Sequence, residues 1–179
     1  LLEEDSRAAL RLMESAVQSA TYLVFSLAEV DRARAGMGTT ISAALVHGSY
    51  VITAQVGDSR IYRVRAGEVQ QLTEDHTLIA WQLKQGLITP QEAKRSPHRN
   101  VITRAVGNRD YVQVDTSIIA LDPGDRLLLC SDGLHGYLRT ADIAPIVALG
   151  GDQAVQRFID LANERGGRDN ITAILVEVH

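Results

Sequence analysis

The sequence is poor in several features that would assign a protein to a class. Its 179 residues include a single cysteine, which excludes an internal disulfide and is typical of a reducing compartment, so we expect a cytoplasmic protein. No apolar run approaches the roughly 18 residues that a membrane helix needs, and the chain opens without a signal-peptide pattern. The net charge is −4, so neither nucleic acid nor an anionic membrane is expected as a partner.

Common catalytic patterns are missing as well. The glycines of Gly36–Thr40 are followed by neither a lysine nor a helix, so the Walker and dinucleotide patterns fail. Six residues after Cys130 stands Gly136 and not the arginine of a cysteine phosphatase, so we interpret Cys130 as a small core residue. Ser59 and Ser131 lack the G-x-S-x-G elbow of Ser-His-Asp hydrolases. The five histidines show no i, i+4 zinc pair, and we expect each on the surface or in a loop.

Aspartates, by contrast, stand at the ends of three predicted strands. The apolar run Leu127–Cys130 predicts a buried strand, and Asp132 follows it. Asp58 follows a second predicted strand, and Asp169 stands just before the last one, Ile171–Val178. Such residues are common in solvated turns. Three strand ends can also meet at one edge of a sheet, where carboxylate oxygens would bind a hard cation. The pattern therefore predicts either turns or a metal site.

Most of the chain is expected to form paired strands after one long helix. The helix is predicted from about Glu4 to Ala33, either packed on a sheet or as a coiled coil, and its apolar stripe comprises Ala9, Met13, Ala16, Ala20, Leu23, Leu27 and Val30. Strands joined by short turns favour antiparallel sheets. We expect them at Ile41–His47, Tyr50–Val56, Arg60–Arg65, Glu68–Leu72, Val112–Leu121, Arg126–Cys130 and Ile171–Val178. Strands with helices inserted and appended indicate an α+β architecture.

The segment Glu74–Asp110 differs from its surroundings. Short helices are predicted at Thr77–Gln85 and from Thr89-Pro90, where a threonine cap precedes a proline. The segment concentrates basic residues in an acidic protein, namely Lys84, Lys94, Arg95, Arg99 and Arg104. It is expected to be either a solvated insertion or a flap that contacts substrate. Two further helices, Ala141–Leu149 and Gln153–Arg165, are predicted near the end of the chain, capped by Thr140 and Asp152.

Six motifs, taken together and in order, carry a family resemblance. They are Gly36–Thr40, Gly57-Asp58-Ser59-Arg60, Leu72-Thr73-Glu74-Asp75-His76, Arg99-Asn100-Val101-Ile102-Thr103-Arg104-Ala105, Cys130-Ser131-Asp132-Gly133-Leu134 and Gly167-Arg168-Asp169-Asn170-Ile171-Thr172. From Gly36 to Val178 the chain resembles the metal-dependent protein phosphatases of the PP2C type, in their bacterial form. The resemblance implies an αββα sandwich of two antiparallel sheets flanked by helices. It also implies one phosphatase domain over residues 1–179, lacking its first strands, with a flap inserted at residues 74–110.

The resemblance implies a function and a set of site residues. The expected reaction is hydrolysis of phosphoserine and phosphothreonine in proteins, a serine/threonine kinase among them, by water activated on two or more Mn²⁺ or Mg²⁺ ions. Asp132 and Asp169 match the family's later metal ligands, and Asp58 matches a weaker additional site. Two cations lower the pKa of a bridging water and polarise phosphoryl oxygens, so no nucleophilic side chain is needed. The flap residues implied to contact substrate are Arg95, His98, Arg99 and Arg104.

Some motifs that the resemblance implies do not occur in these 179 residues. The family has an N-terminal strand with an acidic metal ligand and a phosphate-binding arginine, and a glycine-rich Asp-Gly motif before its first long helix. We expect a fragment of a complete phosphatase, because a decayed site would have little reason to keep Asp58, Asp132 and Asp169. Little activity is then expected of the 179 residues alone. The alternative is an inactive module of the same fold that binds phosphoproteins or a kinase. A nucleotide-binding regulator is disfavoured by the missing phosphate loop.

Overall fold

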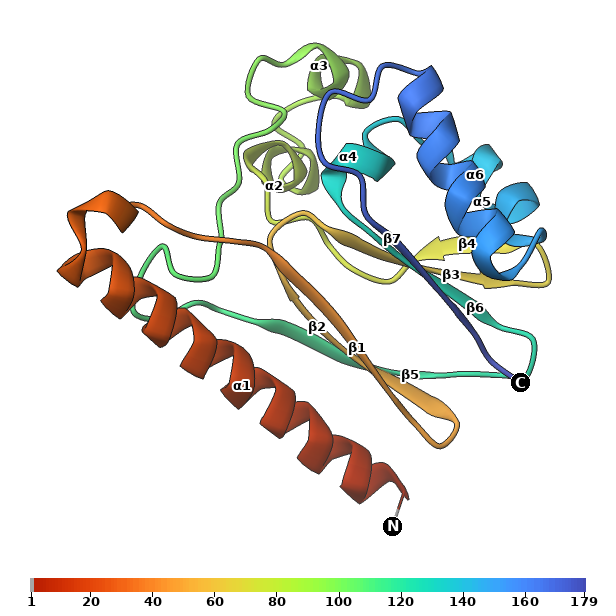
Figure 1. The fold of residues 1–179 in the computed structure, drawn as a ribbon, viewed down its shortest axis with the longest axis horizontal. Helices are drawn as coiled ribbons and strands as arrows, with labels where there is room; N and C mark the ends of the chain where they lie inside the picture. The colour runs from red at the N-terminus through yellow and green to blue at the C-terminus, as the bar shows by residue number, and fades with distance from the viewer. Residues whose placement is uncertain (1) are drawn as a thin grey trace. The chain divides into compact units, whose positions relative to one another are not determined.

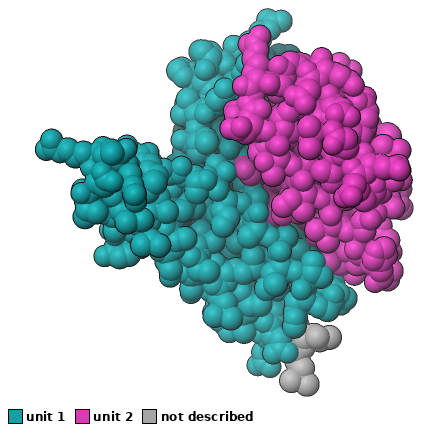
Figure 2. All heavy atoms as spheres, viewed as in Figure 1, with its two compact units in different colours: residues 1–58, 74–120 teal, residues 59–73, 121–179 magenta. Residues whose placement is uncertain are grey.

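The structure, a computed structural model, describes residues 2–179. It divides into two compact units, each with its own antiparallel sheet (Figures 1 and 2). Unit 1 comprises residues 1–58 and 74–120, and unit 2 comprises residues 59–73 and 121–179. None of the helices within residues 2–179 combines the length and the apolar character that crossing a membrane requires.

Unit 1 packs a long helix against a three-stranded sheet. The helix α1 (Leu2–Val30) is followed by a short 3-10 helix, η1 (Arg32–Arg34), and Figure 1 shows α1 running along the sheet. The strand order is β1-β2-β5, with β1 (Ile41–His47), β2 (Tyr50–Val56) and β5 (Asp115–Ala120). Both pairings are antiparallel, so Val51 of β2 lies between Val46 and Ile119. The core of the unit is formed by Val17, Ala54, Val56, Val106, Val112 and Val114.

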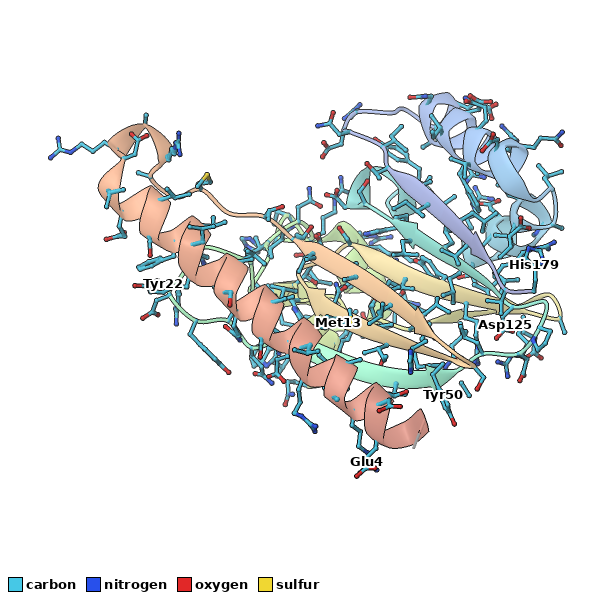
Figure 3. All side chains as sticks on the ribbon, turned by 60° about the horizontal axis from the view of Figure 1, so that its bottom comes forward. Glu4, Met13, Tyr22, Tyr50, Asp125 and His179 are labelled. Carbon is cyan, nitrogen blue, oxygen red and sulfur yellow. The ribbon has the colours of Figure 1, made fainter. Side chains whose placement is uncertain are left out.

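The predicted apolar stripe of α1 is wrong at several positions. Val17 and Ala28 are buried, whereas Leu23 and Val30 of the predicted stripe are 59% and 83% exposed. Met13 packs on the core of unit 1, and Figure 3 shows it and the exposed Tyr22 along the helix. Apolar side chains occur around much of α1, so their spacing alone does not identify the face that packs.

The segment of unit 1 between residues 74 and 110 holds two short helices, α2 (Leu78–Lys84) and α3 (Pro90–Arg95). Both predicted starts are confirmed. The Thr77 hydroxyl accepts from the N–H of Ala80, and Thr89 and Glu92 form a reciprocal capping box around a proline at the first helical position. The segment's two arms are joined at their base, because Thr77 pairs with Ile102 in an isolated bridge.

Unit 2 consists of a four-stranded antiparallel sheet and the helices that pack against it. The strand order is β4-β3-β6-β7, with β3 (Arg60–Arg65), β4 (Glu68–Gln71), β6 (Arg126–Cys130) and β7 (Ala173–Glu177). The helices are α4 (Asp132–His135), α5 (Thr140–Val147) and α6 (Gly151–Glu164). Phe158 of α6 and Leu128 of β6 are fully buried in the core that the helices form with the sheet. Cys130 is also buried, at 4% exposure, so its predicted place in the core is confirmed.

The limits of a few elements differ from the prediction. Strand β5 begins at Asp115 and not at Val112, because Val112 and Val114 pack into the core of unit 1 without pairing in the sheet. Strand β7 is likewise shorter than predicted. Helix α4 was not expected, since Asp-Gly is a common turn pair. Helix α6 is preceded by Gly150, whose φ is +72°, and Asp152 lies inside its first turn.

Candidate metal centre

Asp132 stands where the buried strand β6 ends. It is the first residue of α4 and is exposed, and its Oδ1 accepts a hydrogen bond from the N–H of Gly133 at 2.9 Å. The strand before it is apolar, with Leu127 and Leu128 fully buried. The carboxylate therefore lies at the point where the core of unit 2 gives way to solvent.

Ser131 joins the end of β6 to the segment that leads into β7. Its hydroxyl donates to the carbonyl of Asn170 at 3.2 Å and accepts from the N–H of Thr172 at 3.1 Å. Its own N–H donates to the carbonyl of Thr172 at 3.2 Å. These bonds hold the segment that contains Asp169 beside the turn that contains Asp132. From the sequence, Ser131 was considered only as a nucleophile, and this role was missed.

Gly133 lets the two segments approach each other closely. A Cβ atom at this position would lie 2.2 Å from the carbonyl oxygen of Asn170 and 3.4 Å from Cβ of Asp169. Real Cβ atoms do not approach a backbone oxygen so closely. The Asp169 segment can therefore pass this close to residue 133 only because that residue is glycine. The structure thus brings Asp132 and Asp169, which are far apart in the sequence, to the same place in unit 2.

Both aspartates are exposed acidic groups without a cationic partner in the described chain. Oδ1 of Asp169 accepts from the N–H of Asn170 at 2.7 Å. Within residues 2–179, neither Asp132 nor Asp169 forms a salt bridge with a lysine, arginine or histidine. Two carboxylates that the fold brings to one place, and that no salt bridge in the described chain engages, offer the oxygen ligands that Mg²⁺ and Mn²⁺ prefer.

These two carboxylates would be two of the ligands that a bound cation needs. No group of three or more histidine, cysteine, aspartate or glutamate residues within the described chain could hold a metal ion. Magnesium is commonly bound through one or two carboxylates, with water and phosphate oxygens filling its other positions. Asp132 and Asp169 therefore fit a hard divalent cation in donor type, and their assignment as ligands remains a prediction.

Asp58 lies in unit 1, at the end of β2. The expectation that three strand ends share one edge of a single sheet is wrong, because β2 belongs to the three-stranded sheet and β6 and β7 to the four-stranded one. Asp58 is 9% exposed. The glycine before it is required by the backbone, since Gly57 has φ +103° and a Cβ there would lie 2.5 Å from Cβ of Thr40. Its proposed part in a weaker cation site stays a prediction.

His76 is the functional candidate that the sequence analysis missed. It was expected on the surface or in a loop, and it does lie in a loop, but it is buried, at 4% exposure, at the base of the 74–110 segment. Its Nδ1 accepts from the N–H of Gly57 at 3.1 Å, and its Nε2 lies 2.9 Å from Oδ2 of Asp115. The one available signal was its place in the Leu72–His76 motif.

The carboxylate beside His76 is ionised. Burial acts to raise the pKa of Asp115, but hydrogen bonds from His76 and Arg104 outweigh burial and hold that pKa below its ordinary value. Nη1 of Arg104 donates to Oδ1 of Asp115 at 2.7 Å. The three side chains form one polar cluster inside unit 1.

The four flap residues expected to contact substrate fall into two groups. Arg95, at the end of α3, and His98 and Arg99, in the following loop, are exposed. Arg104 is half-buried and engaged with Asp115, so its charge is already compensated. A hollow of about 540 Å³ lies beside Arg104 in unit 1, and Trp81 and Lys84 also line it. Contact of these residues with substrate remains a prediction.

Comparison with known proteins decides the family. The model described as "Protein phosphatase 2C" matches residues 2–175. The chain belongs to the protein phosphatase 2C family. The protein phosphatase PhpP of Streptococcus pneumoniae is 40% identical over 151 residues, which are 83% of this chain and 61% of PhpP. The chain thus spans less than two thirds of the length of such curated relatives.

Solved structures of relatives share the fold of this PP2C chain. The serine/threonine phosphatase of S. agalactiae matches with a TM-score of 0.89 and 40% identity, over 93% of this chain and 69% of that one. The catalytic domain of the serine/threonine protein phosphatase PstP, in complex with two manganese ions, matches with a TM-score of 0.85 and 32% identity, over 94% and 71%. The expected α+β fold, with two antiparallel sheets and flanking helices, is thereby confirmed.

Proposed function

We propose that the protein containing this chain hydrolyses phosphoserine and phosphothreonine in other proteins with Mn²⁺ or Mg²⁺ as cofactor. The observation that carries the proposal is the pair formed by Asp132 and Asp169, two exposed carboxylates brought to the same place at Gly133, neither of which forms a salt bridge within residues 2–179. Membership of the protein phosphatase 2C family supports it. So does the relative PstP, which binds two manganese ions.

The chain's own residues would hold the cations and leave room for the substrate. Asp132 and Asp169 would bind a hard cation, and Asp58 would help to hold a weaker additional one. When bound, such ions supply a hydroxide from water and neutralise charge on the phosphoryl oxygens. Ser131 would act only by holding the Asp169 segment in place, since its hydroxyl already makes two hydrogen bonds.

A covalent phosphoenzyme has no place in this proposal. The Cys130 thiol is buried within the core of unit 2, where an incoming phosphate group would lose its hydration. The proposed substrates are phosphorylated proteins, a serine/threonine kinase among them, contacted through Arg95, His98, Arg99 and Arg104. We propose a cytoplasmic location, in keeping with the single cysteine.

The proposal is tested by turnover in the full-length protein. We expect hydrolysis of p-nitrophenyl phosphate and of a phosphothreonine peptide with Mn²⁺ or Mg²⁺ but not with EDTA. Asp132→Asn and Asp169→Asn should each lower turnover by about 100-fold or more, since bound metal supplies several kcal/mol of transition-state stabilisation. Asp58→Asn should have an intermediate effect, and Cys130→Ser should retain most of the activity.

The matched control is Asp152→Asn, the same chemical change at an exposed position on α6. It should leave turnover unchanged. A full-length protein that is inactive with every divalent metal and still binds the phosphothreonine peptide would reject the enzyme. That result would support the alternative, an inactive module that binds phosphoproteins.

A further inference from the structure

The two peptides that flank the Gly57 Cα, the second of which leads into Asp58, are held by buried polar groups of unit 1. The N–H of Gly57 donates to Nδ1 of His76 at 3.1 Å, and its carbonyl accepts from the N–H of His76 at 2.9 Å. The same carbonyl accepts from Nε2 of Gln55 at 3.0 Å. Gln55 and His76 are 2% and 4% exposed. One hydrogen bond to the Val56–Gly57 peptide and two to the Gly57–Asp58 peptide, all in a dry environment, leave the backbone on both sides of the Gly57 Cα little freedom to tilt.

The hydrogen-bond partners of His76 determine its tautomer. Because Nδ1 accepts from the Gly57 N–H, it carries no proton, and the neutral ring must be protonated at Nε2. That Nε2–H then donates to Oδ2 of Asp115 at 2.9 Å. In the other tautomer, a protonated Nδ1 would face the N–H of Gly57 and a bare Nε2 would face a carboxylate. Only the Nε2–H form satisfies both contacts, and a doubly protonated ring would lose the bond to Gly57.

Asp115 is itself oriented by a second partner. Nη1 of Arg104 donates to Oδ1 of Asp115 at 2.7 Å and lies 3.1 Å from Nε2 of His76. Because that ring nitrogen is already protonated, the guanidinium does not use it as an acceptor, and its contribution is to keep the Asp115 carboxylate in place. This resembles the outer-shell arrangement in which a carboxylate sets the tautomer and orientation of an imidazole.

The backbone at Gly57 adopts a conformation that favours glycine. Its φ of +103° lies in the left-handed region, and Thr40 occupies the space of a side chain. The direction in which the chain leaves Gly57, and with it the place from which the Asp58 side chain extends, therefore depends on what holds the peptides on the two sides of Gly57.

We propose that His76 is a positioning residue: as its Nε2–H tautomer, held by Asp115, it fixes the Val56–Gly57 peptide through Nδ1 and so helps to determine where the Asp58 carboxylate lies. The inference rests on the proposed function, in which Asp58 helps to bind a weaker, additional cation. His76 touches neither the substrate nor a cation in this role. It acts through the backbone of its neighbour.

The first test is made on the wild-type, full-length protein. Histidine ring nitrogens labelled with ¹⁵N report their protonation in a long-range ¹H–¹⁵N correlation spectrum. We expect His76 to show a protonated Nε2 and an unprotonated Nδ1, with the Gly57 amide proton shifted downfield by its hydrogen bond. A proton on Nδ1 overturns the proposal. This measurement needs no variant and no activity.

The second test compares two substitutions that keep different parts of the ring. In His76→Asn the amide oxygen can take the place of Nδ1 and accept from the Gly57 N–H. In His76→Gln the polar end reaches the position of Nε2, so the Gly57 N–H loses its acceptor. We expect His76→Gln to weaken Mn²⁺ binding at the weaker site about tenfold and to move the Gly57 amide signal, whereas His76→Asn should stay within about twofold of the wild type.

The matched control is His47→Gln, the same change at an exposed histidine at the end of β1. It should alter neither Mn²⁺ affinity nor the Gly57 signal. If His76→Gln does not fold, Asp115→Asn serves in its place. The proposal then expects a mixture of His76 tautomers and an upfield shift of the Gly57 amide proton, and an unchanged spectrum overturns it.

The outcomes separate this inference from the proposed function. If the protein hydrolyses the phosphothreonine peptide while His76→Gln binds Mn²⁺ as tightly as the wild type, the positioning role is wrong and the function stands. If the protein is inactive but Mn²⁺ affinity and the Gly57 signal change as expected, the positioning role stands and the function fails. If Asp58→Asn has no effect on Mn²⁺ binding, the positioning role is also wrong, because the carboxylate it serves holds no cation.

Discussion

At the scale of single residues, the smallest side chains of unit 2 determine what the acidic ones can do. Gly133 makes no polar side-chain contact of its own, yet the Asp169 segment can approach Asp132 only because Gly133 has no Cβ. Ser131 then ties the same segment with its hydroxyl. A carboxylate pair of this kind therefore depends on its neighbours as much as on the two aspartates.

Gly133→Ala should damage the candidate centre without any change in charge. Alanine is the better helix former by about 1 kcal/mol, but its methyl group would collide with the carbonyl of Asn170, so we expect a net loss of about 1–3 kcal/mol in the free energy of unfolding. Mn²⁺ affinity should fall as the Asp169 segment is displaced. Chemical denaturation and calorimetric titration of the full-length protein measure the two effects.

Gly86→Ala is the comparison for this variant. Gly86 has φ +68°, and a Cβ added there would have nothing within 4 Å. The substitution should therefore cost only about 1 kcal/mol of backbone strain and leave Mn²⁺ binding unchanged. If Gly133→Ala were as stable as the wild type and bound Mn²⁺ equally well, the close approach of the two segments would not exist.

At the scale of elements, an ion pair joins the two longer helices of unit 2. Arg165, just after α6, donates through Nη1 to Oδ2 of Asp142 in the first turn of α5 at 2.6 Å, and through Nη2 to Oδ1 at 3.1 Å. The Arg165 guanidinium, together with the N–H of Arg139, lowers the pKa of Asp142 to about 2. Both side chains are less than a third exposed, so solvent screens this bidentate pair only in part.

Asp142→Asn should lower the melting temperature in a manner that depends on pH. The folded-state pKa lies below the unfolded value of about 3.9, so the ionised carboxylate stabilises the fold above about pH 4 and this contribution is lost as the pH falls through about 2. We expect a loss of about 2–4 °C at pH 7 that shrinks towards zero near pH 2. Thermal unfolding of both proteins across this range provides the measurement.

Asp160→Asn, on the exposed face of α6, is the control for Asp142→Asn and should show a much smaller effect at pH 7. An equal loss at pH 7 and pH 2 for Asp142→Asn would mean that the ion pair does not account for the stabilisation.

At the scale of the whole molecule, a cation that binds only the folded state should raise the free energy of unfolding. A cation that binds the folded state at 100 times its dissociation constant stabilises it by about 2.7 kcal/mol. For a chain of this size that corresponds to a rise of about 5–10 °C in melting temperature. In EDTA, by contrast, we expect Asp132 and Asp169 to repel each other, since neither forms a salt bridge within residues 2–179.

We therefore expect Mn²⁺ to raise the melting temperature of the full-length protein by several degrees. The double variant Asp132→Asn, Asp169→Asn should melt about 1–3 °C above the wild type in EDTA and gain little from Mn²⁺, because it has lost both the repulsion and the ligands. Differential scanning calorimetry with Mn²⁺ and with EDTA makes the comparison. A wild-type melting curve that ignores the metal would count against the site.

Much of the local structure was predictable because its causes are local. Strands β1, β2, β3 and β6 have the predicted limits, since each is a β-prone run with a tight turn at one end. The starts of α2 and α3 follow from threonine caps that bind an N–H three residues away. Asp132 and Asp169 were also proposed as ligands from the sequence, because an aspartate just after or just before an apolar strand is visible without knowing its neighbours, and that assignment stays a prediction.

What the sequence could not decide depends on groups that are distant along the chain. His76 bonds to Gly57 and Asp115, which are 19 and 39 residues away, so its own neighbours in the sequence gave no sign of its burial. The packed face of α1 was mistaken, because the helix carries apolar residues on several sides and the sheet selects one of them. Gly133 likewise looks like an ordinary turn glycine in the sequence. Only the structure shows that the backbone of Asn170 lies where its side chain would be. Hydrophobic pattern and caps determine the elements, whereas burial, tautomer and the meeting of two carboxylates arise only when the elements pack.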